Sequence, residues 1–536
     1  MEEKKVVFDA EAASRLVEEL RGGFTAGKTR TYEWRMSQLK GIMKIVEDHE
    51  QEIVEALRSD LSKPELEAVI YEVSMVNSAC SVAIKKLKQW MMAEKVKTSI
   101  TTFPSSAEIV PEPLGVVLVI APWNYPFLLS IEPVIGAIAA GNAVVLKPSE
   151  VAPASSSLLA KLFRACMDNS LIRVVQGAVP ETTALLEQKW DKICYTEGKY
   201  TSVRMVNSFW QWKNWTGCDG SCCKAPYTSS TGTWRKMSTV VDSGINLHVA
   251  SRRIVAGKWG CNSGQTCVAP DYILTTKDYA PKLVDALKHT LEEFYGKNQL
   301  ESKDLSRIVN SNHFSRLIKL LDEDQVSGKI VHGGERDKSN LRISPTILLD
   351  VPRDSMIMNE EIFGPLLPIL TKDYFIEKIE NLVGENSQNF YFIHGEINSD
   401  IPFCLKQVEK VEDSFDIINS GTKPLAAYLF TNNKELKEQF VMTVSAGGML
   451  VNDTVIHLGV DTLPFGGVQE SGMGSYHGKF SFDAFTHKKA VLCRGFAGDA
   501  PVRYPPYTKG KIRLVKALIC GTILGIISAL MGLSKD

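Results

Sequence analysis

The sequence predicts an α/β protein built on a parallel sheet, and three observations support this prediction. The stretch 115–121, GVVLVIA, is a short continuous apolar run that is typical of a buried strand. A helical stretch over 130–140 is followed by Gly141 and Asn142, which are typical helix terminators, and 143–146 begins a second apolar strand. Strand, helix and strand in this order indicate a doubly wound sheet, whose ligands bind at the carboxyl ends of the strands.

The composition is that of a long globular chain in a reducing compartment. The chain has 536 residues, of which 44% are hydrophobic, and its net charge of -1 gives no general attraction to nucleic acid. Its eleven cysteines have no regular spacing, and the start Met1–Lys5 lacks the apolar core of a signal peptide. Cys218, Cys222 and Cys223 lack a second ligand pair at zinc spacing, so no metal site is expected. We expect a cytosolic body that does not bind nucleic acid.

The elements on either side of the first strand fit this scheme. Apolar residues recur at helical spacing over 10–93, which predicts a series of amphipathic helices. A short extended stretch over 104–110 precedes the strand, and further strands are expected at 174–175 and 193–195, with a helix over 182–187 between them. Later helices are expected over 246–257, 280–295 and 314–321, and later strands over 272–275, 343–349, 424–430 and 447–452.

One thiol stands out as a candidate nucleophile. Cys267 ends the run Gly264-Gln-Thr-Cys267, in which small residues leave room for a ligand to approach the sulfur. A thiol attacks as its thiolate, which backbone N–H groups and a positively polarised site favour. The alternative is a small buried hydrophobe, which is what most unpaired cysteines are.

Polar side chains follow both predicted strands of the first βαβ unit. Asn124 follows the first strand and offers an amide donor for a developing oxyanion. Lys147 and Glu150 follow the second strand and can bind ribose hydroxyls or a phosphate. The alternatives are that Asn124 forms a turn beside Pro126 and that Lys147 is a solvated strand end.

Six motifs in family order resemble the aldehyde dehydrogenase superfamily, in particular its class 3 branch. They are Pro122-Trp-Asn-Tyr-Pro126, Lys147-Pro-Ser-Glu150, Gly264-Gln-Thr-Cys267, Glu361-Ile-Phe-Gly-Pro365, Pro464-Phe-Gly-Gly467 and Ser471-Gly-Met-Gly-Ser-Tyr-His-Gly478. The likeness runs from about residue 10 to about residue 507. Gln469 is a mild departure, because the family favours Gly there.

The resemblance implies a role for each matching residue. Cys267 would be the nucleophile and Asn124 the oxyanion donor, and a cofactor, NAD or NADP, would be bound by Trp123, Lys147, Ser149, Glu150, Glu361 and Phe363. The implied activity is oxidation of small-molecule aldehydes to carboxylic acids through a Cys thiohemiacetal and a thioester. The implied assembly is a homodimer.

The resemblance also implies how the chain divides into domains. A variant Rossmann cofactor domain would cover 1–234, with a bridging hairpin at 98–110, and an α/β catalytic domain would cover 235–445. Residues 446–507 would return to the cofactor domain and complete a small bridging sheet.

The family pattern breaks first over 195–237. The family has a glycine turn, the helix that receives the pyrophosphate, and then Leu-Glu-Leu-Gly-Gly-Lys, whose Glu is the general base. Residues 219–237 can be written in codons that, moved forward by one base, read Met-Ala-Ala-Ala-Ala-Lys-His-Leu-Thr-Pro-Val-Ala-Leu-Glu-Leu-Gly-Gly-Lys. We interpret this as a frame displacement that leaves Gly232 and Thr233 in place of the carboxylate. Reduced activity is the expected consequence, and the alternative is a catalytically inactive dimer partner of an intact enzyme.

The second break covers 372–407, between two stretches that the family joins directly. Its end, Phe403-Cys-Leu-Lys-Gln407, can be encoded as a pyrimidine-rich stretch closing in CAG, as in a retained intron. The alternative is a surface loop insertion, which large enzymes tolerate.

The C-terminal stretch 514–533 is a candidate membrane anchor. Residues 517–533 carry no charge, and Lys509, Lys511, Arg513 and Lys516 stand just before or at its start. About 20 apolar residues are needed to span a bilayer, and a basic flank favours the cytosolic side. The alternative is a buried C-terminal helix.

Overall fold

A computed structural model describes most of the chain. It covers residues 8–98, 104–196, 236–371, 411–497 and 501–520, together with residues 102, 499, 524 and 527. The predicted frame displacement and the predicted insertion fall almost entirely outside the described residues. The described part is mixed α/β, as the sequence predicts.

The first sheet is parallel and has the strand order β5-β4-β3-β6. Its strands are β3 (Val116–Ile120), β4 (Ala143–Lys147), β5 (Ile172–Val174) and β6 (Lys192–Tyr195). Ile120 pairs with both Lys147 and Tyr195, so the carboxyl ends of three strands lie at one edge. The predicted βαβ unit is therefore present, and Asn124 and Lys147 both stand at this edge.

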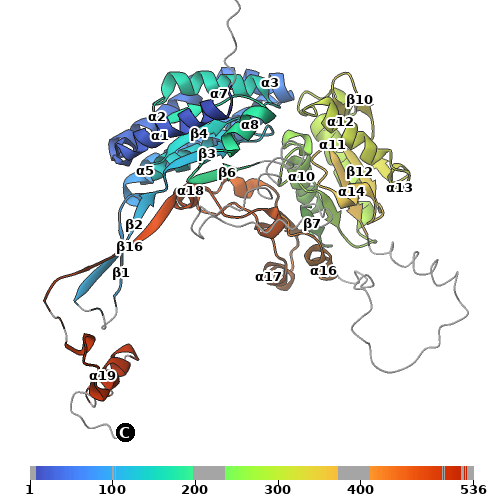
Figure 1. Ribbon diagram of the computed structural model, residues 1–536. Coiled ribbons are helices and arrows are strands. Elements are labelled where there is room, and N and C mark those ends of the chain that lie inside the picture. The colour runs from blue at the N-terminus through green and yellow to red at the C-terminus, as the bar shows by residue number, and fades with distance from the viewer. Residues whose placement is uncertain are drawn as a thin grey trace, which may run out of the picture.

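Helices cover this sheet and form the largest hydrophobic core (Figure 1). They are α1 (Ala10–Thr25), α2 (Tyr32–Asp48), α3 (Glu50–Leu61), α4 (Glu65–Ala68), the π-helical turn η2 (Val69–Ser74), α5 (Met75–Trp90), α6 (Leu128–Ala140), α7 (Pro153–Cys166) and α8 (Val179–Leu186), with a short 3-10 turn η1 (Lys28–Arg30). Every residue of α6 is buried, and the helix ends at Gly141, whose φ of 92° suits a residue without a Cβ.

The second sheet has seven strands in the order β15-β14-β7-β8-β13-β12-β9. They are β7 (Ser238–Val241), β8 (Tyr272–Leu274), β9 (Ile330–His332), β12 (Thr346–Leu349), β13 (Leu366–Leu370), β14 (Ala426–Phe430) and β15 (Gly448–Val451). All neighbours are parallel except β9 and β12. Two hydrophobic clusters pack on this sheet.

The predicted strand over 343–349 is divided in two. Arg342–Ile343 forms β11, which pairs with β10 (Arg336–Asp337), and Thr346 begins β12. The Ser344 amide still donates to the Glu335 carbonyl, whereas the Thr346 amide donates to the Pro365 carbonyl beside β13. Pro345 has no N–H to continue either ladder, so the chain changes partners there.

Helices also surround the seven-stranded sheet and link its strands. They are α10 (Leu247–Lys258), η4 (Asn262–Gly264), α11 (Ala280–Tyr295), η5 (Gln299–Glu301), α12 (Ser311–Leu321), α13 (Asp324–Ser327), α14 (Met356–Asn359), α16 (Asp413–Ser420) and α17 (Lys434–Thr443). The short turns η6 (Ile456–Gly459) and η7 (Gln469–Ser471) follow β15, and α18 (Gly478–Ala484) packs against α6 and α5 of the first lobe. Gln469 has a φ of 53°, which explains why glycine suits this position better.

A third sheet forms an arm that projects from the two lobes (Figure 1). Its strands β1 (Glu94–Val96), β2 (Ser105–Pro113) and β16 (Thr486–Arg494) are antiparallel, with β2 in the centre. The predicted bridging hairpin at 98–110 is thus longer than expected at both ends, because β1 begins at Glu94 and β2 continues to Pro113. The predicted boundaries of the domains remain predictions.

The described chain continues beyond the arm into η8 (Pro501–Arg503) and α19 (Lys509–Ile519). Within the described residues, no helix is both long enough and apolar enough to cross a membrane. Most of the predicted anchor, from residue 521 onward, lies outside them except for Leu524 and Ile527.

Candidate active site

The loop that carries Cys267 begins with three consecutive residues in the left-handed region. Asn262, Ser263 and Gly264 have φ values of 51°, 49° and 78°. Such a backbone is costly for residues other than glycine, so surrounding contacts must hold it. The Asn262 amide donates to Glu67 Oε1 at 2.8 Å, and Ser263 Oγ donates to the Ser306 carbonyl at 2.7 Å.

The next two residues of the loop are held equally firmly. Gln265 Nε2 donates to the carbonyl of Arg307 at 2.9 Å, and Gln265 Oε1 accepts from the amide of Val309 at 3.0 Å. Thr266 Oγ1 donates to the Cys261 carbonyl and lies 2.9 Å from the hydroxyl of Tyr125. Cys267 itself is only partly buried, beside a small core cluster that includes Val268, Tyr428 and Phe465. The loop is therefore fixed while its thiol keeps some access to solvent.

Asn124 lies directly against this loop. Its side-chain nitrogen Nδ2 donates to the carbonyl of Gln265 at 3.1 Å, two residues before Cys267. Asn124 is 3% exposed. The structure therefore brings together the proposed nucleophile and the proposed oxyanion donor, although one follows β3 and the other precedes β8.

The loop with Glu361 and Phe363 packs on the other side of the nucleophile loop. Trp259 Nε1 donates to the Pro365 carbonyl at 2.7 Å. Asp271, which follows the nucleophile loop, joins the Glu361 loop to the start of β7, because its Oδ1 accepts from the Ile362 amide at 3.1 Å and its Oδ2 from the Met237 amide at 3.1 Å. Glu361, which precedes Ile362, thus lies near the nucleophile loop, and its cofactor-binding role remains a prediction.

Trp123 and Phe363 are in contact. Their rings are edge to face with centroids 5.5 Å apart, and the His313 ring meets Trp123 at 5.2 Å. Phe363 has a φ of 47°, so its backbone is strained at this contact. These aromatic side chains join the carboxyl edge of the first sheet to the Glu361 loop.

Lys147 and Glu150 form an ion pair at the end of β4. Lys147 Nζ lies 2.6 Å from Glu150 Oε2, and Lys147 is 3% exposed, so it is not a solvated strand end. Ser149 Oγ accepts from the Val151 amide at 3.3 Å, which gives this serine a local capping contact. The residues that follow β6 after Thr196 lie outside the described residues.

Two lysines near Asp271 have lowered pKa values; Lys258 is fully buried and Lys236 is partly buried. Burial lowers the pKa of Lys258 to about 8, and Asp271 opposes this shift. Burial likewise lowers the pKa of Lys236 to about 8, although its Nζ donates to the Ile357 carbonyl at 2.6 Å. Lys258 Cε would be 3.3 Å from a Cβ at Gly264, so this side chain packs beneath the nucleophile loop.

The sequence patterns missed a set of buried polar side chains beneath the site. Lys63, Glu67 and Glu72 are at most 6% exposed, and all three contact segments that carry Asn124 or Asn262. A second missed pair, Glu132 and His477, lies 3.5 Å apart between α6 and the start of α18.

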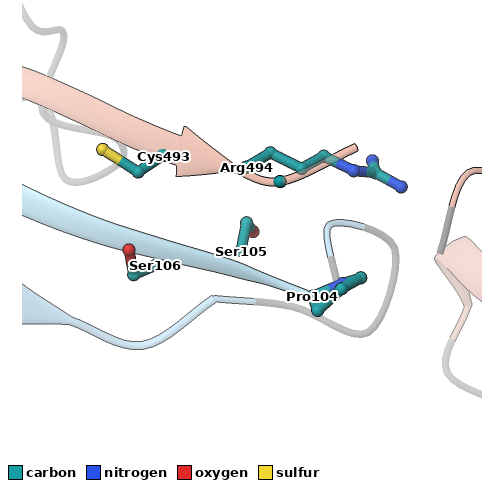
Figure 2. A pocket seen from close by; sticks show the side chains of 6 residues that line it. Pro104, Ser105, Ser106, Cys493 and Arg494 are labelled. Carbon is teal, nitrogen blue, oxygen red and sulfur yellow. The ribbon is translucent and has the colours of Figure 1, made fainter. Parts of the chain in front are cut away.

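The hollow shown in Figure 2 is remote from this chemistry. It measures about 560 Å³ and lies at the tip of the arm, between β2 and β16, lined by Pro104, Ser105, Ser106, Cys493, Arg494 and Gly495. It contains none of the predicted site residues. The positions of Cys267 and Asn124 therefore define the candidate active site better than this hollow does.

The fold combines a lobe built on a parallel, Rossmann-like sheet with a second α/β lobe. The chain belongs to the aldehyde dehydrogenase family, whose model matches residues 6–383 and 403–491. The unmatched residues 384–402 lie inside the predicted 372–407 insertion.

Individual relatives agree with this membership. The chain is 59% identical to aldehyde dehydrogenase family 3 member H1 of Arabidopsis thaliana over 99% of both chains. It is 56% identical to the chloroplastic family 3 member I1 of the same plant, over 99% of this chain and 87% of the relative. The substrate-bound structure of Staphylococcus aureus AldH superposes with a TM-score of 0.80 at 36% identity, over 94% of this chain and 99% of that one.

More distant solved structures share the fold. A glyceraldehyde-3-phosphate dehydrogenase of Methanocaldococcus jannaschii, solved with NADP, is 20% identical with a TM-score of 0.70 and covers 92% of this chain and 96% of its own. An indole-3-acetaldehyde dehydrogenase solved with NAD+ is 21% identical with a TM-score of 0.71, over 91% and 89% of the two chains.

Proposed function

We propose that this chain carries the site for NAD(P)-dependent oxidation of aldehydes to carboxylic acids, with Cys267 as the nucleophile. Its thiolate would attack the aldehyde carbonyl and form a thiohemiacetal, and Asn124 Nδ2 and the Cys267 amide would stabilise the oxyanion. Loss of a hydride then leaves a thioester, which water hydrolyses with the help of a general base. The hydrogen bond from Asn124 to Gln265 carries this proposal, because it links the oxyanion donor to the nucleophile loop.

The cofactor side of the site fits a dinucleotide in its described part. The buried Lys147 and its partner Glu150 stand at the carboxyl edge of a parallel sheet, where ribose hydroxyls find a cation and an acceptor. Ser149 belongs to the same turn, and Trp123 contacts Phe363, two residues after Glu361. When bound there, the nicotinamide accepts the hydride.

We also propose that this particular chain is a weak or inactive dehydrogenase. Its positions 232 and 233, where the family has the general-base Glu, are Gly and Thr, and they lie outside the described residues. Without a base, the thioester would persist, because attack by neutral water is slow. Acylation of Cys267 would then occur more readily than turnover.

The first experiment is to sequence the transcript across the codons for Thr196 to Val240. The purified chain is then compared with a frame-restored variant, whose segment 197–237 is rebuilt from the transcript, by following NAD(P)H formation with an aliphatic aldehyde. We expect the frame-restored variant to be active, its Cys267→Ser form to be inactive and the original chain to be at least tenfold slower. Equal rates for the original and restored chains would refute the impairment, and an active Cys267→Ser form would refute the nucleophile.

A catalytically inactive dimer partner is the second candidate function, and the arm sheet favours it. The sheet β1-β2-β16 projects from the lobes, and among the described residues no strand pairs with the outer edge of β16. Such an edge is available to a second copy. Co-purification with a tagged frame-restored subunit, without NAD(P)H formation by the chain alone, would support this role, and failure to co-purify would exclude it. A chain that stays monomeric by itself in light scattering would exclude the homodimer.

We propose that the C-terminal tail holds the cytosolic body to an intracellular membrane. Helix α19 carries Lys509, Lys511, Arg513 and Lys516 and buries no side chain, so its basic residues can face lipid headgroups. The uncharged run 517–533 follows directly. Flotation of the full chain with anionic vesicles, lost on truncation after Thr508, would support the anchor; flotation unaffected by truncation would refute it.

A further inference from the structure

A stripe of polar side chains begins at Lys63, between α3 and α4, and continues along α4 and η2. It consists of Lys63, Glu67, Tyr71 and Glu72, of which Tyr71 is only partly buried, and we call it the polar stripe. Lys63 and Glu72 are 1% and 0% exposed, and Glu67 is 6% exposed. A π-helical turn such as η2 is rare and is often found at functional sites. Charged side chains are almost never buried to this degree unless they are paired or have a function.

Lys63 and Glu72 form an ion pair whose other contacts all go to one segment. Lys63 Nζ lies 2.7 Å from Glu72 Oε1, donates to the Asn124 carbonyl at 3.1 Å and sits 4.0 Å from the ring centroid of Tyr125. Glu72 Oε2 accepts from the amides of Phe127 and Leu128, both at 3.0 Å. One ion pair therefore holds the segment 124–128 at both ends.

The position of Asn124 depends on this segment. Its carbonyl also accepts from Asn262 Nδ2 at 3.0 Å, and its side-chain Nδ2 donates to the Gln265 carbonyl at 3.1 Å. A primary amide nitrogen has two hydrogens, so the bond to Gln265 fixes the direction of the second N–H. A shift of the Asn124 backbone would turn this second donor away from the thiol.

Stability alone does not account for such a pair. Removing two charges from water costs several kcal/mol each, and replacing a buried pair by apolar side chains is often neutral or stabilising. Burial also raises the pKa of Glu72, an effect that Lys63 and the two amides oppose. What the pair provides and an apolar replacement would not is a fixed set of hydrogen bonds to the Asn124 segment.

We propose that Lys63 and Glu72 are positioning residues for Asn124, which set its amide toward the oxyanion that forms at Cys267. This inference rests on the proposed carbonyl chemistry of Cys267. It goes beyond that chemistry because neither side chain needs to touch substrate or cofactor.

The test uses a carbonyl reaction that requires neither cofactor nor general base. With p-nitrophenyl acetate, the Cys267 sulfur bonds to the acyl carbon, p-nitrophenolate leaves with the electron pair, and the thiol proton goes to solvent. This acylation passes through a tetrahedral oxyanion. Alkylation by iodoacetamide displaces iodide at the same sulfur without an oxyanion, so it reports the thiol alone.

We expect Lys63→Met to slow the acylation burst of the full-length chain by about 10- to 100-fold, which is less than the roughly 100- to 1000-fold loss when an oxyanion donor is removed outright. The rate of alkylation by iodoacetamide should stay within about threefold of the original rate. Glu72→Gln should slow acylation less than Lys63→Met does and should likewise leave alkylation nearly unchanged. Lys161→Met is the matched control, because it breaks a surface ion pair with Glu52. The side chains of Lys161 and Glu52 are 66% and 43% exposed.

A double variant separates positioning from a general structural effect. If Lys63 acts through Asn124, then Lys63→Met should slow acylation little further in an Asn124→Ala background. Unchanged acylation in Lys63→Met, an equal loss of acylation and alkylation, or full additivity with Asn124→Ala would each overturn the inference. An original chain that is not acylated at Cys267 would overturn it too.

Failure of the proposed function has a separate signature. In that case the frame-restored chain would form no NAD(P)H with aldehydes, even though the ester still acylates Cys267 and the variants still differ. The two outcomes are therefore distinguishable in the same set of proteins.

Discussion

Gly264 of the nucleophile loop lies against the carbonyl oxygen of Gly364 in the Glu361 loop. A Cβ at position 264 would stand 2.2 Å from that oxygen, and Gly264 has a φ of 78°. Position 264 therefore needs glycine for two reasons, the backbone conformation and the approach of the second loop. This contact sets how closely the thiol and Glu361 can come together.

Substitution of Gly264 by alanine should separate the two loops. We expect Gly264→Ala to cost about 3 kcal/mol or more in the free energy of unfolding, from the left-handed backbone and the overlap with Gly364. Gly244→Ala is the matched control, because Gly244 has a φ of 74° and a methyl group there would have no atom within 4 Å, and it should cost about 1 kcal/mol. Urea unfolding measures both; equal losses would show that the contact with Gly364 is unimportant.

Asp271 should be essential for joining β7 to the Glu361 loop. In Asp271→Asn only one side-chain oxygen remains for the amides of Met237 and Ile362, so we expect a loss of about 2–4 kcal/mol. Asp278 is exposed, and Asp278→Asn should stay within about 0.5 kcal/mol of the original chain. Chemical denaturation of the two variants gives the comparison, and a stable Asp271→Asn would contradict the bridging role.

Replacing Arg316 by lysine should lower the stability of the protein. Its guanidinium holds Glu360 Oε1 at 2.8 Å and the Ile362 carbonyl at 2.6 Å, which a single ammonium cannot reproduce in the same geometry. We expect Arg316→Lys to lower the free energy of unfolding by about 2 kcal/mol. Arg336→Lys, at the exposed pair with Asp322, should cost less than about 1 kcal/mol. Similar costs at both sites would argue against a special role for the two contacts of the partly buried Arg316 guanidinium.

His477 and Glu132 should give opposite pH dependences of stability. Burial lowers the pKa of His477 to about 4 and raises that of Glu132 to about 8, so both groups are neutral between these values. For His477 the folded state binds fewer protons, so its stability contribution is lost as the pH falls from about 6.5 toward 4. For Glu132 the folded state binds more protons, so stability is lost as the pH rises from about 4.5 toward 8.

The variants His477→Gln and Glu132→Gln serve as controls for each other. His477→Gln should remove about 3 kcal/mol of the acid-side loss, and Glu132→Gln about 5 kcal/mol of the loss on the alkaline side. Urea midpoints measured from about pH 4 to about pH 9 give both slopes. A variant that shifts the whole curve without changing its slope would show that the residue does not titrate as described.

The sequence predicted the elements of the fold correctly where the local hydrophobic pattern agrees with the burial of the residues in the structure. Val116–Ile120 is apolar throughout and is buried throughout, and Gly141 ends α6 as expected. The division of 343–349 was not predicted, because the apolar pattern continues across Pro345 while the hydrogen-bond partners change. A change of the strand with which a segment pairs cannot be predicted from the local apolar pattern when that strand is distant in sequence.

The candidate site was predictable only where a motif marks it. Cys267 and Asn124 each belong to a recognisable motif, and their loops meet in the structure. The polar stripe was missed because α4 reverses the ordinary rule: Leu66 is 71% exposed while the neighbouring Glu67 is buried. A charged residue on a short helix is expected to face solvent until the structure shows what covers it.

The meeting of Asn124 and Cys267 has a consequence for incomplete molecules. One residue follows a strand of the four-stranded sheet and the other precedes a strand of the seven-stranded sheet. A chain in which only one of these halves has matured thus possesses a sulfur without its amide, or an amide without its sulfur. We therefore expect fast reaction with carbonyls only after both halves have folded and their loops have met.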